Sequence, residues 1–541
     1  MTSYEYGTVL AATVPAPSIE YSKLAPMLIV FGVAVTGVLA EAFLPRRHRY
    51  ATHIVLGLAG LVAALVAVIR LSGTNTTAVV GAVSIDGVTL FLQGTIIVVA
   101  ILALLFIAER GVEPRARVRS GPGTWSMAAV AAGHGVDAFT PQASSVPGSA
   151  GETAAIRAGV ATTEVFPLTL LAVGGLLLFP ASNDLLTMFV ALEVLSLPLY
   201  LLCGLARRKR LLSQEAGLKY FLLGAFSSTF FLYGVALLYG QAGTVRLDGI
   251  ADSIAQHPQN TTLALLGIGL LAVGLLFKIG AVPFQSWVPD VYQGAPTPIT
   301  GFMAAATKIA AVGALLRLLQ VAVPGLRDDW RPVLAAISIA TMVIGAVMAI
   351  TQTDVKRMLA YSSVAHAGFI LTALVAANDA GVSAVLFYLL AYGIGTIGAF
   401  GVVSLVRESS GDEATSMTQW AGLGRRSPWL ATVFALFLLS FAGLPLTSGF
   451  VSKFAVFQAA ASGGAAALVI VGVIASAIAA FFYIRVIVLM FFTDPPTDAP
   501  VVVTPFLTTI VVTFTAGATI LLGIIPQSIL DIADRATTFA H

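Results

Sequence analysis

Long apolar runs follow one another along almost the whole chain, and they restrict the possible folds more than any other feature. A run of about 20 mostly apolar residues can cross the hydrocarbon core of a bilayer as an α-helix. By this criterion the chain has about fourteen candidate spans. Their approximate cores are residues 24–44, 54–70, 88–108, 164–180, 183–206, 215–240, 262–289, 296–322, 330–350, 356–377, 382–406, 428–459, 464–492 and 501–525. The sequence therefore predicts an all-α protein that crosses a membrane many times.

The composition agrees with a membrane protein and excludes several functions. Of the 541 residues, 58% are hydrophobic and 10% are charged, whereas a soluble domain has about 25% charged residues. The formal net charge of +3 is too small to suggest nucleic-acid binding. The single cysteine, Cys203, excludes an intrachain disulfide, a four-cysteine iron–sulfur cluster and a CxxC redox pair. If the chain serves a redox enzyme, we expect the electrons to travel in other subunits.

Lys and Arg are distributed unevenly between alternate loops. The loops after the first, third, fifth, ninth and eleventh spans are rich in them, and the others are poorer. Examples of the rich loops are Arg46, Arg47 and Arg49, and the run Arg207, Arg208, Lys209 and Arg210. Positively charged loops favour the cytoplasmic side of a membrane. We therefore expect the odd-numbered spans to end in the cytoplasm and both termini to lie outside, in a bacterial inner membrane.

Residues 110–162 interrupt the apolar pattern. They are rich in Gly, Ala, Ser and Pro and show no sustained periodicity, which is typical of a largely flexible insertion. By the orientation given above, this insertion is cytoplasmic. The resulting division of the chain is 1–109 for the first three spans, 110–162 for the insertion, 163–323 for spans four to eight, 324–493 for spans nine to thirteen, and 494–541 for the last span and the tail.

Spans four to eight resemble spans nine to thirteen. The matching segments are 183–185 and 353–355, 219–223 and 386–390, and Lys278-Ile-Gly-Ala-Val-Pro283 and Ser440-Phe-Ala-Gly-Leu-Pro445. These matches predict two copies of a unit of about five helices, and an odd number of spans per copy inverts the second copy in the membrane. Inverted repeats with broken helices are a transporter architecture.

Pro283 and Pro445 occupy matching positions in the two repeats. A proline inside a helix removes one hydrogen bond and clashes with the preceding turn. The carbonyls that it frees must be satisfied by protein or water. We therefore expect broken helices at Pro283 and Pro445, which bring polar backbone to the depth of nearby lysines.

Several ionisable side chains lie inside the predicted spans, where an unpaired charge is costly and is functional by default. They are Glu193, Lys219, Lys278, Lys308, His366 and Lys453. Desolvation disfavours the charged form of an amine, so a buried lysine can take up and release a proton near neutral pH. Histidine titrates near neutral pH and can relay protons through both ring nitrogens. The set predicts a path for protons.

Structural readings of the same residues remain open. Any one of these lysines could form an ion pair with Glu193, and Lys219, nearer a span end, could extend to the membrane interface. A lone histidine such as His366 is often a hydrogen-bonded core residue. Arg317 and Arg485 lie near span ends and are interpreted as interface anchors. Residues 393–398 match GxGxxG without a preceding strand, so helix packing is favoured over dinucleotide binding.

The motifs around these residues resemble one family. Residues 277–298, which include Phe277-Lys278-Ile-Gly-Ala-Val-Pro283 and Asp290-Val-Tyr292-Gln-Gly294-Ala-Pro296, resemble the antiporter-like subunits of respiratory NADH–quinone oxidoreductase (complex I), and the N subunit most of all. Residues 191–200, 359–368 and 444–454 complete the similarity, which extends from the first span to the last. The insertion departs from the family's compact pattern.

The resemblance implies a mechanism and partners. It implies two half-channels, with an ion pair between Glu193 and Lys278, a central relay at Lys308 and an exit site at Lys453. The related M subunit carries a glutamate at the position of Lys453. NADH, FMN, iron–sulfur clusters and quinone would bind to other subunits, and this chain would hold no cofactor and no metal. The implied partners are the M, J and K membrane subunits and the peripheral redox arm. The bias toward Ala, Gly, Val and Arg suits a high-GC bacterium, in which menaquinone is the expected acceptor.

Two alternatives to a proton-pumping subunit of complex I remain at this point. The same motifs would serve a cation/proton antiporter or a membrane-bound hydrogenase, and co-purification with redox subunits would discriminate between them. The third reading is a structural membrane scaffold with inert buried ion pairs. A scaffold predicts that charge-neutral substitutions leave pumping intact.

Overall fold

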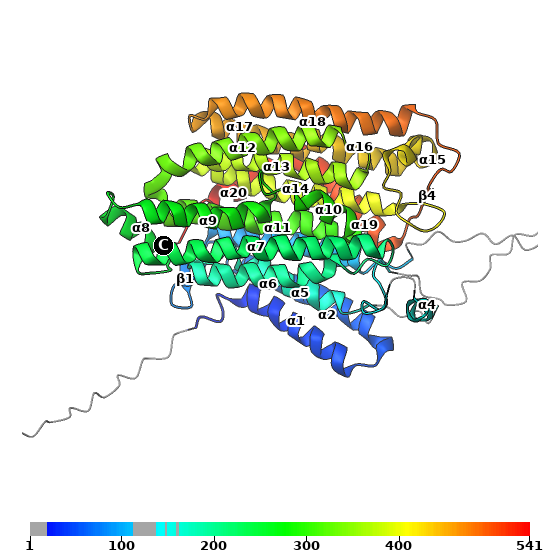
Figure 1. Cartoon of the computed structure of the whole chain (residues 1–541), viewed down its shortest axis with the longest axis horizontal. Helices are drawn as coiled ribbons and strands as arrows, with labels where there is room; N and C mark the ends of the chain where they lie inside the picture. The colour runs from blue at the N-terminus through cyan, green and yellow to red at the C-terminus, as the bar shows by residue number, and fades with distance from the viewer. Residues whose placement is uncertain (1–18, 112–136, 147–148, 158–161, 541) are drawn as a thin grey trace, which may run out of the picture.

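The computed structural model describes residues 19–111, 137–146, 149–157 and 162–540. Within these residues the regular structure is almost entirely helical, and the helices lie side by side along one direction (Figure 1). The only sheets in this part of the chain are two small antiparallel pairs. They are β1 (Thr76–Ala78) with β2 (Val83–Ile85), in which Thr76 lies opposite Ile85, and β3 (Val406–Arg407) with β4 (Val501–Val502).

Among the described residues, 12 helical segments are long and apolar enough to cross a membrane. They are α1 (Ala25–Phe43), α2 (Arg46–Arg70), α3 (Gly87–Ile107), α6 (Leu185–Cys203), α7 (Arg210–Ala242), α9 (Thr262–Ile279), α11 (Thr297–Arg317, continued by the π-helix Leu318–Ala322), α12 (Arg327–Ile350, preceded by the 3₁₀ turn Pro324–Leu326), α13 (Val355–Ala376), α14 (Asp379–Leu405), α18 (Ala466–Phe492) and α19 (Phe506–Ile524). Two apolar helices are shorter, α5 (Val165–Leu178) and α16 (Pro428–Ala442). The predicted all-α, many-span membrane fold is confirmed, whereas the count of about fourteen spans stays a prediction.

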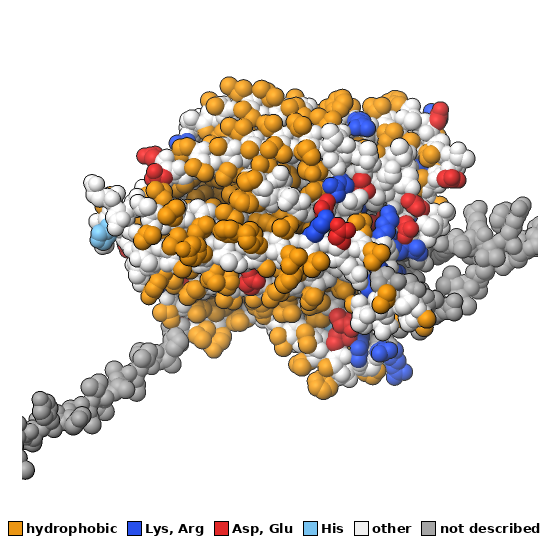
Figure 2. All heavy atoms as spheres, in the orientation of Figure 1, with side chains coloured by type: hydrophobic (Ala, Val, Ile, Leu, Met, Phe, Trp, Pro, Cys, Tyr) orange, Lys and Arg blue, Asp and Glu red, His pale blue; other side chains and the backbone are white. Residues whose placement is uncertain are grey.

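Shorter helices cap or interrupt the long ones. They are α4 (Ala150–Arg157), α8 (Leu247–Gln256), α10 (Trp287–Gly294), α15 (Leu423–Arg426), α17 (Ser448–Ser462), α20 (Gln527–Arg535) and the 3₁₀ turn Met417–Trp420. Hydrophobic side chains cover much of the visible face, and charged side chains gather toward the end of the bundle near α15 and β4 (Figures 1 and 2). This distribution fits a helical bundle surrounded by lipid.

Three helices form the centre of the bundle. Every residue of α11 is buried, and α13 and α14 are buried along almost their whole length. Helices α1, α2 and α18 lie at the margins and expose many apolar side chains. Polar groups on α11, α13 and α14 therefore face protein rather than lipid, which is the arrangement expected of costly intramembrane groups.

Two long helices are interrupted. Helix α9 ends at Ile279 and α10 begins at Trp287, and Pro283 lies between them; α16 ends at Ala442 and α17 begins at Ser448, with Pro445 between them. The residues that follow the first halves, Gly280 and Gly443, have φ of +76° and +88°. Glycine reaches this left-handed region without the steric cost of a Cβ, and the N–H groups of Gly280 and Gly443 donate to the carbonyls of Leu276 and Leu439.

The two predicted repeats share local features. Asp184 and Asp354 cap α6 and α13, each accepting from the backbone N–H three residues later. Each also forms an antiparallel bridge with a later segment, Asp184 with Arg246 and Asp354 with Ser416. These features support the inverted repeat. They concern only the starts of two helices, so the repeat itself stays a prediction.

Part of the insertion, residues 137–140, packs against the rest of the chain, and the flexibility of the insertion stays a prediction. Phe139 is buried and bridges to Ala206, and Thr140 N–H donates to the Leu205 carbonyl at 2.9 Å. Asp137 pairs with Arg207 at 2.6 Å. One buried aromatic ring and an ion pair attach the segment to the loop before α7, a pairing that composition does not reveal. Residues 112–136, 147–148 and 158–161 lie outside the described residues.

Arg317 is not an interface anchor, because its side chain is 0% exposed. It donates to both carboxylate oxygens of Asp86 at 2.8 Å and to Thr89 Oγ1 at 2.7 Å. Asp86 also accepts from the N–H of Ala540 at 2.9 Å. A buried arginine requires such a counter-ion, and here the pair joins α3, α11 and the segment after α20.

Candidate functional site

Most of the ionisable side chains predicted from the sequence are buried in the helical bundle. Lys278, Lys308, His366 and Lys453 are between 2% and 5% exposed. They belong to α9, α11, α13 and α17 respectively. Each one makes its closest polar contacts with hydroxyls or backbone carbonyls, as follows.

Lys278 contacts tyrosines. Its Nζ donates to Tyr200 OH at 3.2 Å and lies 4.9 Å from the centre of the Tyr200 ring and 5.0 Å from that of Tyr220. The direct ion pair with Glu193 that the resemblance implies is not formed among the described residues. Glu193 Oε1 is instead buried without a hydrogen-bond partner. Glu193 and Tyr200 are about two helical turns apart and lie on the same face of α6.

Lys308 lies at the centre of the molecule. Its Nζ donates to Ser363 Oγ at 2.7 Å and also to the Ser363 carbonyl, and it lies 5.0 Å from the centre of the Tyr392 ring. Tyr292 OH is 3.4 Å from the same Ser363 Oγ. Tyr292 belongs to α10, the second part of the first interrupted helix. This helix therefore contacts the Lys308 site through Ser363.

His366 has a hydroxyl at each ring nitrogen. Nδ1 is 2.6 Å from Tyr388 OH, and Nε2 is 3.3 Å from Tyr483 OH. Tyr483 is also hydrogen-bonded to Ser362. Imidazole can receive a proton at one nitrogen and release it from the other, so this geometry is compatible with a relay.

Lys453 contacts the second helix interruption. Its Nζ donates to the Ala442 carbonyl at 3.0 Å and to Ser476 Oγ at 2.7 Å. Ala442 is the last residue of α16, so its carbonyl has no helical partner. The break around Pro445 thus supplies the acceptor that holds this lysine.

Lys219 is not part of the buried set. Its side chain is 41% exposed and pairs with Asp290 and Glu215, both at 2.8 Å. Asp290 also pairs with Arg357 at 2.7 Å. Because Asp290 lies on α10, Lys219 attaches α7 to the part of the first broken helix that follows the interruption.

Sequence reasoning missed the hydroxyl groups between the lysines. Tyr220 stacks on Trp287 at 4.7 Å, and Trp287 lies 6.3 Å from Tyr292, so aromatic side chains fill the space between Lys278 and the Lys308 site. Tyrosines in apolar spans were the available signal, since a buried tyrosine usually has a hydrogen-bond partner. In the part of the chain that the structure describes, no group of three or more His, Cys, Asp or Glu could hold a metal ion.

Comparison with known proteins identifies the family. The family described as NADH:quinone oxidoreductase/Mrp antiporter, transmembrane, matches residues 182–479, which contain all six predicted ionisable residues. The chain belongs to this family. Membership confirms the resemblance that the motifs around Lys278, His366 and Lys453 indicated.

Individual members of the NADH:quinone oxidoreductase/Mrp antiporter family resemble the chain over nearly its full length. A Rhodococcus opacus (strain B4) protein named NADH-quinone oxidoreductase subunit N is 67% identical, covering 100% of both chains. A chain of respiratory complex I from Thermus thermophilus is 32% identical with a TM-score of 0.73, covering 94% of this chain and 99% of that one. A chain of the Mrp complex from Dietzia sp. DQ12-45-1b is 21% identical with a TM-score of 0.76, covering 96% and 97%, which shows the shared fold alone.

Proposed function

We propose that this chain is the counterpart of subunit N and translocates protons in an NADH–quinone oxidoreductase. The observation that carries the proposal is the series of buried amines held by neutral partners, at Lys278, Lys308 and Lys453. The 67% identity with a protein named subunit N supports the choice of complex.

Neutral partners suit a group that must change its protonation state. Tyrosine and serine hydroxyls can donate to a neutral amine or accept from an ammonium, so they bind both protonation states of a lysine. Protons would pass from the Glu193–Lys278 region to Lys308, and then by His366 to Lys453. Glu193 lies close to Tyr200 along α6 and would bias Lys278 through its charge. Lys219, which is partly exposed, would hold α10 in position through its ion pair with Asp290.

The redox chemistry would take place in other subunits. NADH, FMN, the iron–sulfur clusters and the quinone would bind to partners, and this chain would contribute as a translocase. We place it beside the M, J and K subunits, in the inner membrane of a bacterium, with both termini outside. The excess of Lys and Arg in alternate loops supports that orientation.

A cation/proton antiporter subunit is the second candidate function, because the description of the matching family also names the Mrp antiporter. The two candidates differ in partners. Purification of the chain from native membranes with subunits that oxidise NADH supports the first candidate, and purification with subunits lacking redox cofactors supports the second.

The direct test is Lys278→Ala in the assembled complex. We expect proton pumping and coupled NADH oxidation to fall by about tenfold or more, because a buried proton-transfer group is removed. Proton uptake by vesicles, NADH oxidation and subunit composition would be measured together. The control is Lys23→Ala, which removes a lysine outside the helices that is bonded to Thr76 at 3.2 Å. Normal pumping by Lys278→Ala in a fully assembled complex would contradict the proposal.

A further inference from the structure

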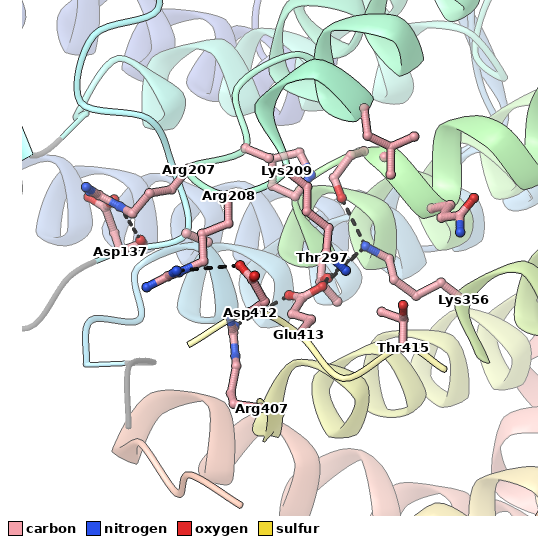
Figure 3. Close-up of a pocket in the computed structure, with 17 residues that line it drawn as sticks. Asp137, Arg207, Arg208, Lys209, Thr297, Lys356, Arg407, Asp412, Glu413 and Thr415 are labelled. Atoms are coloured by element: carbon pink, nitrogen blue, oxygen red, sulfur yellow. Dashed lines mark hydrogen bonds and ion pairs between the residues drawn. The ribbon is translucent and has the colours of Figure 1, made fainter. Parts of the chain in front are cut away.

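A polar cavity of about 80 Å³ lies at the charged end of the bundle. Its lining combines charges of both signs, from Asp137, Arg207, Arg208, Lys356, Asp412 and Glu413 (Figure 3). The insertion supplies one wall through Asp137. A polar space of this size holds several water molecules. Water can therefore reach Glu413, whose side chain is 18% exposed.

Glu413 and Lys356 meet at the inner wall of this cavity. Lys356 is 3% exposed, and its Nζ lies 3.4 Å from Glu413 Oε2. It also donates to Thr297 Oγ1 at 3.0 Å and to the Ala295 carbonyl at 3.1 Å, as Figure 3 shows for its amino group. Burial raises the pKa of Glu413, but the charges of Lys356 and Arg407 outweigh it and keep this pKa below its usual value. Glu413 therefore bears a negative charge next to the amino group of Lys356.

Helix α13 connects this pair to the central lysine. Lys356 and Ser363 are seven residues apart on one face of the helix, a rise of about 10 Å. Ser363 Oγ accepts from Lys308 at 2.7 Å. Lys356 thus lies about two turns from Ser363, the residue that binds Lys308. It is near the end of α13 that borders the large cavity.

A second, small cavity lies along this stretch. Its volume is about 10 Å³, and Leu359, Ser362, Tyr392 and Thr396 are among its lining residues. This space is comparable to the volume required for one water, which needs two to four polar partners. Thr396 Oγ1 is buried and forms no hydrogen bond of normal geometry among the described residues, so a water here would satisfy it. Tyr392 also borders Lys308, which lies 5.0 Å from its ring centre.

We propose that Glu413 and Lys356 form the proton-uptake site that supplies Lys308, with Thr396 and a water in the small cavity as the connection. Lys356 releases one proton to this water, and the water passes one through the Thr396 and Tyr392 hydroxyls to the Lys308 amine. A proton from the aqueous side, conducted by the waters of the large cavity, then restores the Lys356 ammonium group, and Glu413 stabilises its charge. No electron moves and no covalent bond between heavy atoms changes. This inference rests on the proposed function.

Lys356→Arg in the assembled complex separates proton transfer from a structural role. Arginine keeps the positive charge and the hydrogen-bond donors, but it does not release a proton in proteins. We expect pumping and coupled NADH oxidation to fall by about tenfold, with assembly and heat stability retained. Lys209→Arg, at an exposed lysine of the same cavity, is the matched control. Normal pumping by the assembled Lys356→Arg complex would overturn the inference.

Thr396→Val tests the small cavity without changing any charge. We expect slower pumping from this variant and normal pumping from Thr515→Val, since Thr515 Oγ1 is bonded to its own helix at 2.8 Å. Equal pumping by both variants would overturn the role of the small cavity. If Lys356→Arg and Thr396→Val pump normally while Lys278→Ala does not, this inference fails and the proposed function stands. If Lys278→Ala also pumps normally, both fail.

Discussion

Asp86 and Arg317 form an ion pair that is fully enclosed by protein, with both side chains 0% exposed. Two full charges removed from water are costly, and their mutual attraction together with the bonds to Thr89 and Pro180 offsets that cost. The loss of one partner is more harmful than the loss of both, because it leaves an uncompensated charge.

Asp86→Asn therefore destabilises the chain by roughly 3–5 kcal/mol. The measurement is heat inactivation of the purified complex, with subunit composition checked before heating. The control is Asp494→Asn, which breaks an exposed pair with Arg425 and is expected to cost less than about 1 kcal/mol. Equal inactivation temperatures for the two variants would refute this account of the buried pair.

The sequence predicted the buried amines but not the groups that hold them. Lys278, Lys308 and Lys453 stand out because a charge within an apolar run is rare. Tyr200 and Ser363 do not stand out, since a hydroxyl is common in such helices and its partner is set by tertiary packing. Glu413 was missed for a related reason: a charge in a loop is usually solvated, and nothing in its local sequence indicates that Lys356 is adjacent.

At the scale of the element, the second interrupted helix depends on close packing between its two halves. A Cβ on Gly449 of α17 would lie 1.8 Å from the Ser440 carbonyl oxygen of α16. No side chain fits at that distance, so glycine is required for α16 and α17 to hold Ala442 and Lys453 in contact.

Gly449→Ala should separate these half-helices and weaken the contact between Lys453 and the Ala442 carbonyl. We expect a loss of pumping together with a stability loss of about 1–3 kcal/mol, the usual cost of overpacking. Pumping and heat inactivation would be compared with those of Gly517→Ala in α19, where a Cβ meets nothing within 4 Å. If the Gly449→Ala variant pumps and resists heat like the wild type, the close contact between α16 and α17 is not required.

Elements were predictable where hydrophobicity decides them. The apolar runs predicted helices such as α3, α14 and α18, and Pro283 and Pro445 lie inside the two interruptions. The packing of Phe139 was not predictable, because this residue lies in a Gly- and Ala-rich stretch without periodicity. The burial of Phe139 depends on the loop before α7, which is distant in sequence.

At the scale of the whole molecule, the charges mark one end of the bundle. The loop that contains Glu413 and the loop before α7 lie at the end near β4, whereas α8 lies at the opposite end (Figures 1 and 2). If positive loops face the cytoplasm, the large cavity opens to the cytoplasm and α8 faces outside. Proton uptake through Glu413 and Lys356 would then draw from the cytoplasm.

Cys203 makes this orientation accessible to labelling chemistry. It is the single cysteine of the chain and is fully buried, with its sulfur 3.9 Å from that of Met303. The native chain should therefore resist membrane-impermeant maleimides, and any thiol introduced at an exposed position reports its own side of the membrane. We expect His257→Cys, after α8, to react in spheroplasts and Ser409→Cys, after β3, to react in inverted vesicles. The reverse labelling pattern would mean that the chain has the opposite orientation in the membrane. Protons would then enter from the other side.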